Sequence, residues 1–135
     1  MKYSEMKVND IYKEKFVATD EKVRTFAATS GDNNPLHLDD EFAKKTIFKQ
    51  RIAHGMLVAS FISKVLGRDF PGDGTIYMQQ EVKFTKPVYI NEEVEVEVEV
   101  LEKRDDKKII KLRTDVFNSK GDKVVKGNAT VMKPE

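Results

Sequence analysis

The sequence of 135 residues contains no cysteine, only four prolines and only seven glycines. The absence of cysteine excludes disulfide bonds, zinc sites with cysteine ligands and catalytic thiols. No apolar run approaches the roughly 20 residues that a membrane-spanning helix needs, and residues 1–5 lack the apolar core of a signal peptide. We therefore expect a cytoplasmic protein that does not associate with membranes.

The sequence also lacks an excess of either charge. Lysine and arginine total 24 against 23 for aspartate and glutamate, a net charge of +1. Proteins that bind nucleic acid through its phosphates have a clear basic excess, so no nucleic-acid partner is expected. The length and the 39% of hydrophobic residues suit one globular domain over residues 1–135.

Hydrophobic spacing predicts two main helices. The first begins at a cap at Thr19 or Asp20, places apolar residues three and four positions apart, and ends at Gly31. The second runs from about Ala53 to Leu66 with a broad apolar stripe, and Gly67 is predicted to be its C-cap. A short helical turn is expected between them, at residues 39–45.

Alternating and β-branched residues predict strands elsewhere. In residues 93–100 valine and glutamate alternate, which is typical of a strand with one buried and one solvated face. The expected fold is α+β, with one long helix against a curled antiparallel sheet of about five strands. The predicted strands are Lys13–Ala18, Ile76–Lys86, Glu93–Lys103, Lys108–Asn118 and Val124–Met132.

The loop between the two helices concentrates reactive side chains. Asp32 alone suits a turn residue, and His37 alone suits a structural histidine. Pro35 restricts its own backbone and that of Asn34, so the loop holds both side chains in place. Such preorganisation is what acid–base catalysis needs. The sequence thus offers Asp32 and His37 as an acid–base pair.

The sequence gives less support to a metal site or a serine nucleophile. Asp32, His37, His54 and Asp39 or Asp40 carry metal-binding atoms, but no pair of histidines has the close spacing of a metal site, so no metal is expected. No serine lies in a Gly-x-Ser-x-Gly elbow. Gly55 has two interpretations: its free N–H at a helix start can stabilise an oxyanion, or its small size allows close packing.

The segment from Phe26 to His37, which reads FAATSGDNNPLH, resembles the signature of R-specific enoyl-CoA hydratases in the MaoC-like hydratase/dehydratase family. The resemblance continues through residues 51–57 and 71–77. It implies a hot-dog fold, in which an antiparallel sheet wraps a long helix, and a homodimer or larger homo-oligomer.

The resemblance also implies a reaction. Water would add to a trans-2-enoyl-CoA to give an (R)-3-hydroxyacyl-CoA, with dehydration as the reverse. Asp32 would act as the base, His37 would orient the water, and the Gly55 N–H would bind the thioester oxygen. Coenzyme A would be part of the substrate, and no separate cofactor is expected.

By the same resemblance Ser63, Leu66 and Val131 would line the acyl pocket, although Leu66 and Val131 equally suit a plain core. Three alternatives remain at this stage. A dehydratase of acyl-carrier-protein thioesters would use the same residues. A hot-dog thioesterase and a non-enzymatic acyl-CoA-binding module are further candidates.

Overall fold

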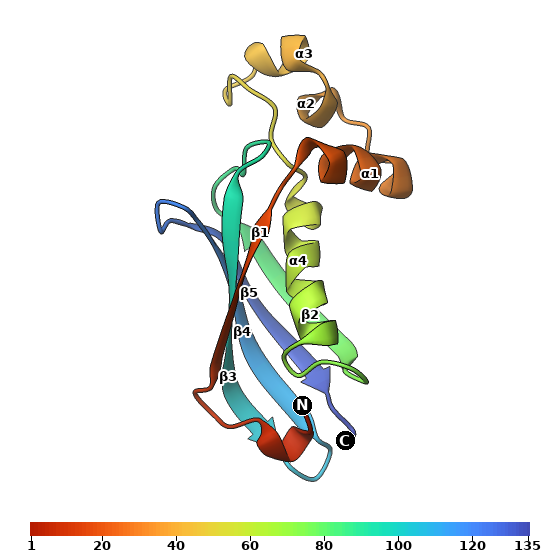
Figure 1. Ribbon diagram of the computed structural model, residues 1–135, viewed down its shortest axis with the longest axis vertical. Coiled ribbons are helices and arrows are strands. Elements are labelled where there is room, and N and C mark those ends of the chain that lie inside the picture. The colour runs from red at the N-terminus through yellow and green to blue at the C-terminus, as the bar shows by residue number, and fades with distance from the viewer.

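An antiparallel sheet of five strands in the order β1-β3-β4-β5-β2 forms the frame of the computed structural model, which describes residues 1–135. The sheet is strongly twisted, and α4 lies lengthwise along it (Figure 1). The predicted five-stranded α+β architecture is therefore confirmed. The strands are β1 (Ile11–Val17), β2 (Ile76–Phe84), β3 (Glu93–Arg104), β4 (Ile109–Asn118) and β5 (Lys123–Met132).

The alternation in β3 decides which face of the sheet is buried. Its four valines, Val94, Val96, Val98 and Val100, are at most 1% exposed. The intervening glutamates lie on the other face, where Arg113 of β4 bonds both Glu97 and Glu99. The valine–glutamate pattern thus gives one apolar and one charged face, as predicted.

Helix α4 (Gly55–Arg68) supplies the other half of the core. Its apolar stripe packs on the valine face of the sheet; the buried residues are Leu57, Val58, Phe61, Ile62, Val65 and Leu66. The helix continues past the predicted end: Gly67 lies inside it, and Asp69 is the C-cap with its N–H bonded to Val65. The helix ends shortly before Pro71, because a proline disfavours helical geometry at the residue that precedes it. None of the helices combines the length and the apolar surface that a membrane-spanning helix requires.

Three short helices form an arm beyond one end of the sheet: α1 (Asp20–Ser30), α2 (Pro35–Leu38) and α3 (Asp40–Lys44) (Figure 1). The predicted ends of α1 are confirmed, with Thr19 as N-cap and Gly31 at a φ of 82° as C-cap. The loop predicted up to His37 is shorter, because Pro35 starts a helical turn that the Asn34 side chain caps. A 3-10 turn, η1 (Tyr3–Glu5), lies at the opposite end of the molecule.

Candidate active site

Asp32 is fixed in place while one of its carboxylate oxygens stays free. Its N–H donates to Ser30 Oγ (3.1 Å), and its backbone carbonyl accepts from His54 Nε2 (3.0 Å). Its Oδ1 accepts from the Asn34 N–H (3.3 Å), so the residue also makes the turn that its type suggests. Oδ2 makes no bond, and the side chain is exposed. Asp32 can therefore accept a proton from a solvent-accessible ligand.

His37 is buried, with 8% of its surface exposed, and its orientation is defined by one strong contact. Its Nδ1 lies 2.7 Å from the Ile52 carbonyl oxygen, which can only accept, so Nδ1 carries the proton. Nε2 of the neutral ring is then a free acceptor. Burial lowers the pKa of His37, and His54 adds to this effect against the opposing influence of the Ile52 carbonyl and Asp32. His37 is thus uncharged near pH 7.

His54 contacts both Asp32 and His37. Its ring stacks on the His37 ring with centroids 3.9 Å apart, and its other neighbour is the Phe26 ring at 4.9 Å. Only 2% of the residue is exposed. Nε2 donates to Asp32, whereas Nδ1 is buried without any hydrogen-bond partner. His54 is also the N-cap residue of α4.

The start of α4 presents unpaired backbone donors. The first N–H groups with acceptors inside the chain are those of Leu57 and Val58, which both bond to the His54 carbonyl. The N–H groups of Gly55 and Met56 are therefore free, and the helix dipole makes this end partly positive. The Phe84 ring packs against Gly55 so closely that a Cβ there would lie 2.9 Å from Cε1. Both interpretations of Gly55, donor and close packing, fit this geometry.

Arg51 stabilises the segment that carries His37. Its Nε donates to the His37 carbonyl (2.8 Å), and its guanidinium forms an ion pair with Asp20 at the start of α1. The bonds from Arg51 and then Arg24 lower the pKa of Asp20. These two contacts of the buried Arg51 side chain link α1 to α2 within the arm.

A cavity of about 460 Å³ joins these groups, and Asp32, His37, His54 and Gly55 all line it. That volume suits a small acyl group and its thioester. The walls are largely apolar, and Lys86 supplies a positive charge. Apolar lining residues include Phe48, Met56, Phe84, Pro87 and Val125.

The predicted acyl-pocket residues do not line this cavity. Leu66 and Val131 are fully buried in the core between α4 and the sheet, and Ser63 is exposed on α4. Leu66 lies near the C-terminal end of α4, whereas Gly55 begins the helix. Their role as an acyl pocket stays a prediction.

Metal binding by Asp32, His37 and His54 suits this geometry poorly. Their ligand atoms lie within 4.8 Å of one another, so their proximity alone would allow a shared ion. The two imidazoles stack with planes only 28° apart, however, so their in-plane lone pairs do not converge on a common point. These residues suit proton transfer better.

Residues 5–121 match the family described as "MaoC like domain". This match spans most of the chain. The chain belongs to the MaoC-like family. Among curated members, it is 48% identical over 113 residues to an (R)-specific enoyl-CoA hydratase of Aeromonas caviae, covering 84% of each chain. It is 37% identical over 132 residues to a mitochondrial 3-hydroxyacyl-[acyl-carrier-protein] dehydratase of Arabidopsis thaliana, covering 96% of this chain and 78% of the relative.

Solved structures of MaoC-like proteins agree closely with this fold. The R-hydratase PhaJ1 of Pseudomonas aeruginosa, unliganded, superposes with a TM-score of 0.95 at 43% identity, covering 99% of this chain and 86% of that one. An (R)-hydratase of A. caviae involved in PHA biosynthesis gives 0.93 at 42% identity, with coverages of 96% and 98%. The predicted family and its hot-dog fold are confirmed.

Sequence patterns did not single out two of the site residues. Arg51 lies in a polar stretch, and its pairing with Asp20 bridges 31 positions of the chain. Phe84 ends β2 and reaches Gly55 only through the tertiary packing. The HGM sequence at residues 54–56 marked the helix start, but nothing in it indicated the stacking of His54 on His37.

Proposed function

We propose that this MaoC-like protein is an (R)-specific enoyl-CoA hydratase, a hydro-lyase that adds water to trans-2-enoyl-CoA and catalyses the reverse dehydration. One observation carries the proposal. Two proton acceptors, Asp32 and His37 Nε2, line the same cavity as the free N–H groups that start α4. The curated relatives with 47% and 48% identity are named (R)-specific enoyl-CoA hydratases.

The two acceptors explain how one water becomes a nucleophile. A water that donates one hydrogen to Asp32 and the other to His37 Nε2 directs its lone pair away from both, toward C3 of the substrate. As the oxygen adds to C3, Asp32 takes a proton from the water. That proton is delivered to C2 on the same face, so the enzyme ends in its starting protonation state.

Charge develops on the thioester oxygen during this addition. The Gly55 N–H, at the partly positive end of α4, donates to that oxygen as the enolate forms. Because the donor belongs to the backbone of a packed helix, it needs no reorganisation during the reaction. Removing such a donor costs about 2.7–4 kcal/mol in other enzymes.

Steady-state hydration of crotonyl-CoA tests the proposal, with Asp32→Asn as the informative variant. Asn keeps an oxygen for the Asn34 N–H but cannot accept the proton, so kcat should fall about 100- to 10,000-fold. Asp39→Asn is the matched control, because it changes an exposed carboxylate that only caps α3. Full activity of Asp32→Asn, or an (S)-configured product from the unmodified protein, contradicts the proposal.

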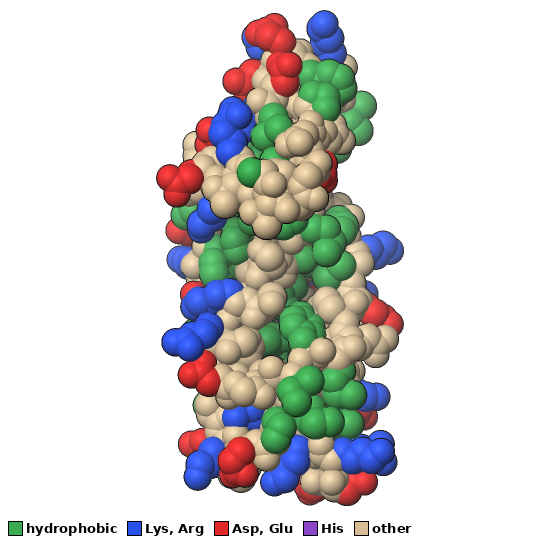
Figure 2. Space-filling view, turned by 90° about the vertical axis from the view of Figure 1, so that its right-hand side faces the viewer, with side chains coloured by type: hydrophobic (Ala, Val, Ile, Leu, Met, Phe, Trp, Pro, Cys, Tyr) green, Lys and Arg blue, Asp and Glu red, His purple; other side chains and the backbone are tan.

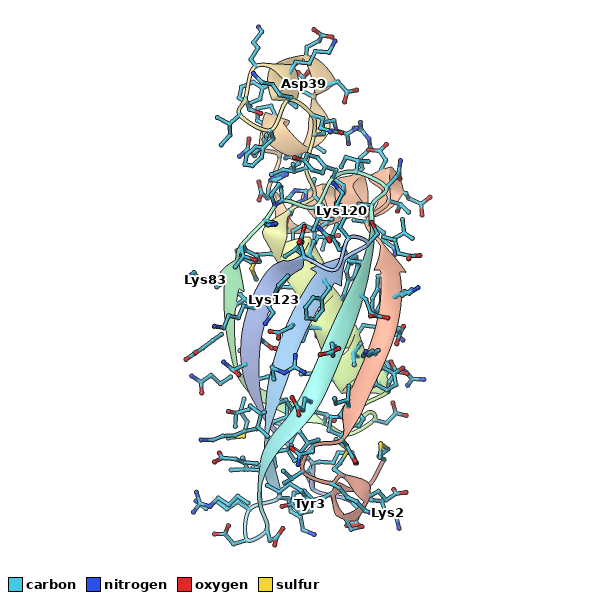
Figure 3. The ribbon with its side chains drawn as sticks, turned by 90° about the vertical axis from the view of Figure 1, so that its left-hand side faces the viewer. Lys2, Tyr3, Asp39, Lys83, Lys120 and Lys123 are labelled. Atoms are coloured by element: carbon cyan, nitrogen blue, oxygen red, sulfur yellow. The ribbon has the colours of Figure 1, made fainter.

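An acyl-carrier-protein dehydratase is the second candidate, because the relative in A. thaliana carries that name. Positive charge near the cavity serves either thioester carrier. Lys86 lines the cavity, and Lys83, Lys120 and Lys123 lie at the upper half of the sheet, toward the arm (Figure 3). Parallel assays with crotonyl-CoA and crotonyl-carrier protein decide between them. We propose the coenzyme A thioester as the better substrate.

We propose that the protein works as a homodimer that pairs through β2. This strand is an edge of the sheet, and exposed apolar residues lie at its start: Ile76, Tyr77 and Met78. Hydrophobic side chains gather in patches along the side of the molecule shown in Figure 2. An exposed apolar edge strand is a template for a second chain. Met78→Lys should give a monomer by light scattering, whereas Leu101→Lys, on an inner strand, should not.

Three further expectations complete the proposal. We propose that hydration needs no cofactor, so activity should survive dialysis against EDTA. We propose a cytoplasmic location, which cell fractionation would test. We also propose that the (R)-3-hydroxyacyl-CoA product supplies polyhydroxyalkanoate synthesis, because the similar (R)-hydratase of A. caviae is involved in PHA biosynthesis. Co-expression with a polymer synthase would test this.

A further inference from the structure

We infer that His54 is a positioning residue that fixes the catalytic groups Asp32, His37 and Gly55 relative to one another. The inference rests on the proposed hydratase function for its kinetic test. The His54 side chain lines the cavity but takes part in no step of the reaction itself.

His54 contacts each catalytic group in a different way. Its Nε2–H donates to the Asp32 carbonyl at 3.0 Å and so fixes the backbone that carries the carboxylate. Its ring face stacks on the His37 ring at 3.9 Å, which limits tilting of the imidazole that orients the water. Its own backbone is the N-cap of α4 and immediately precedes Gly55. One buried residue thus joins a loop, a short helix and a helix N-terminus.

The unpaired Nδ1 makes histidine an unfavourable choice for stability at this position. The atom is buried and has no partner, which is an unfavourable position for a polar group. A leucine or phenylalanine could fill the same space between Phe26 and His37 without that cost. Such a residue could not donate to the Asp32 carbonyl, which would then lose its partner across 22 positions of the chain.

Kinetics of two His54 variants test the inference. His54→Phe keeps an aromatic face but removes the donor, so we expect kcat to fall 10- to 100-fold with KM changed less than threefold, since a misplacement near 1 Å can cost about 100-fold. His54→Gln restores an N–H donor of similar reach and should recover most of that loss. Val65→Ala, in the buried stripe of α4 and off the cavity, is the control for destabilisation alone.

Three kinetic results would contradict the inference. Unchanged kcat in His54→Phe, a similar kcat loss in Val65→Ala, or no recovery in His54→Gln would each assign His54 a merely structural role. All assays are run below the unfolding temperature of the weakest variant, so that the folded fraction does not determine the rate.

Nuclear magnetic resonance gives a readout that does not depend on activity. The chain contains only two histidines, so each imidazole can be assigned directly by comparison with His54→Phe. Nitrogen-15 shifts should show opposite tautomers, with the proton on Nδ1 in His37 and on Nε2 in His54. If the unmodified protein does not hydrate crotonyl-CoA, the proposed function fails. The inference then stands on opposite tautomers and falls if both rings share one tautomer.

Discussion

Substituting Gly55 by alanine separates its two roles, because the substitution keeps the N–H and adds only a methyl group. Gly55 has no positive φ, so its backbone accepts alanine without strain. The added Cβ would lie 2.9, 3.0 and 3.1 Å from three carbons of the Phe84 ring. Contacts between carbons are favourable at about 3.5–4.0 Å, so the ring must move by about 0.6 Å or more.

The movement should affect catalysis more than stability. Phe84 is 48% exposed and can swing toward solvent, while alanine favours helix more than glycine does. We expect the free energy of unfolding to change by less than about 1 kcal/mol. Because Phe84 walls the cavity beside the oxyanion donor, kcat/KM for crotonyl-CoA should fall about tenfold, scaled from the roughly 100-fold that a 1 Å misplacement can cost.

A double-mutant cycle with Phe84→Ala checks the cause. If the collision is responsible, Gly55→Ala should have almost no effect on kcat/KM in the Phe84→Ala background. Stopped-flow absorbance of the conjugated thioester measures the rates, and chemical denaturation measures the stabilities. An undiminished tenfold loss in that background would contradict this explanation, because the N–H itself would then have been displaced.

Further predictions concern the loop, the sheet and the response to pH. Arg51→Lys should lower the free energy of unfolding by about 1–3 kcal/mol and reduce kcat, because lysine cannot bond both Asp20 and the His37 carbonyl; urea denaturation and kinetics measure this. Gly127→Ala should cost about 1–3 kcal/mol in the same assay, because its Cβ would lie 2.7 Å from the Thr114 carbonyl oxygen. Burial lowers the pKa of His37 in the free protein, so kcat/KM should hold at pH 6.5 and decline only below it, as a pH–rate profile would show. Burial acts to raise the pKa of Asp115, but its bonds from Arg113 and Lys123 outweigh this and lower it. Its contribution to stability is therefore present above the unfolded carboxyl pKa of about 3.9 and is lost as the pH falls further. Between pH 7 and pH 2, the urea midpoint of unfolding should therefore fall less steeply in Asp115→Asn than in the unmodified protein.

Local sequence patterns were enough to predict most elements of this fold and the loop that carries the reactive side chains. Alternation in residues 93–100 could only bury valine, since the side-chain period of a strand is two. Thr19 and Gly31 bounded the first helix because capping and left-handed backbone are local properties. Pro35 likewise constrained the loop locally, so the pairing of Asp32 with His37 followed from residues five positions apart.

The contacts between that loop and the rest of the chain depend on the tertiary structure. The proton on His37 Nδ1 depends on the Ile52 carbonyl, and the carbonyl of Asp32 depends on His54, which is 22 positions away. Gly55 faces Phe84 because the end of β2 reaches the start of α4, a contact between segments that no local pattern relates. Hydrophobic periodicity fixes which face of an element is buried but not which residue it meets. The proximity of Asp32 and His37 was therefore predictable from sequence, whereas the contacts of the buried His54 with both residues were visible only once the chain had folded.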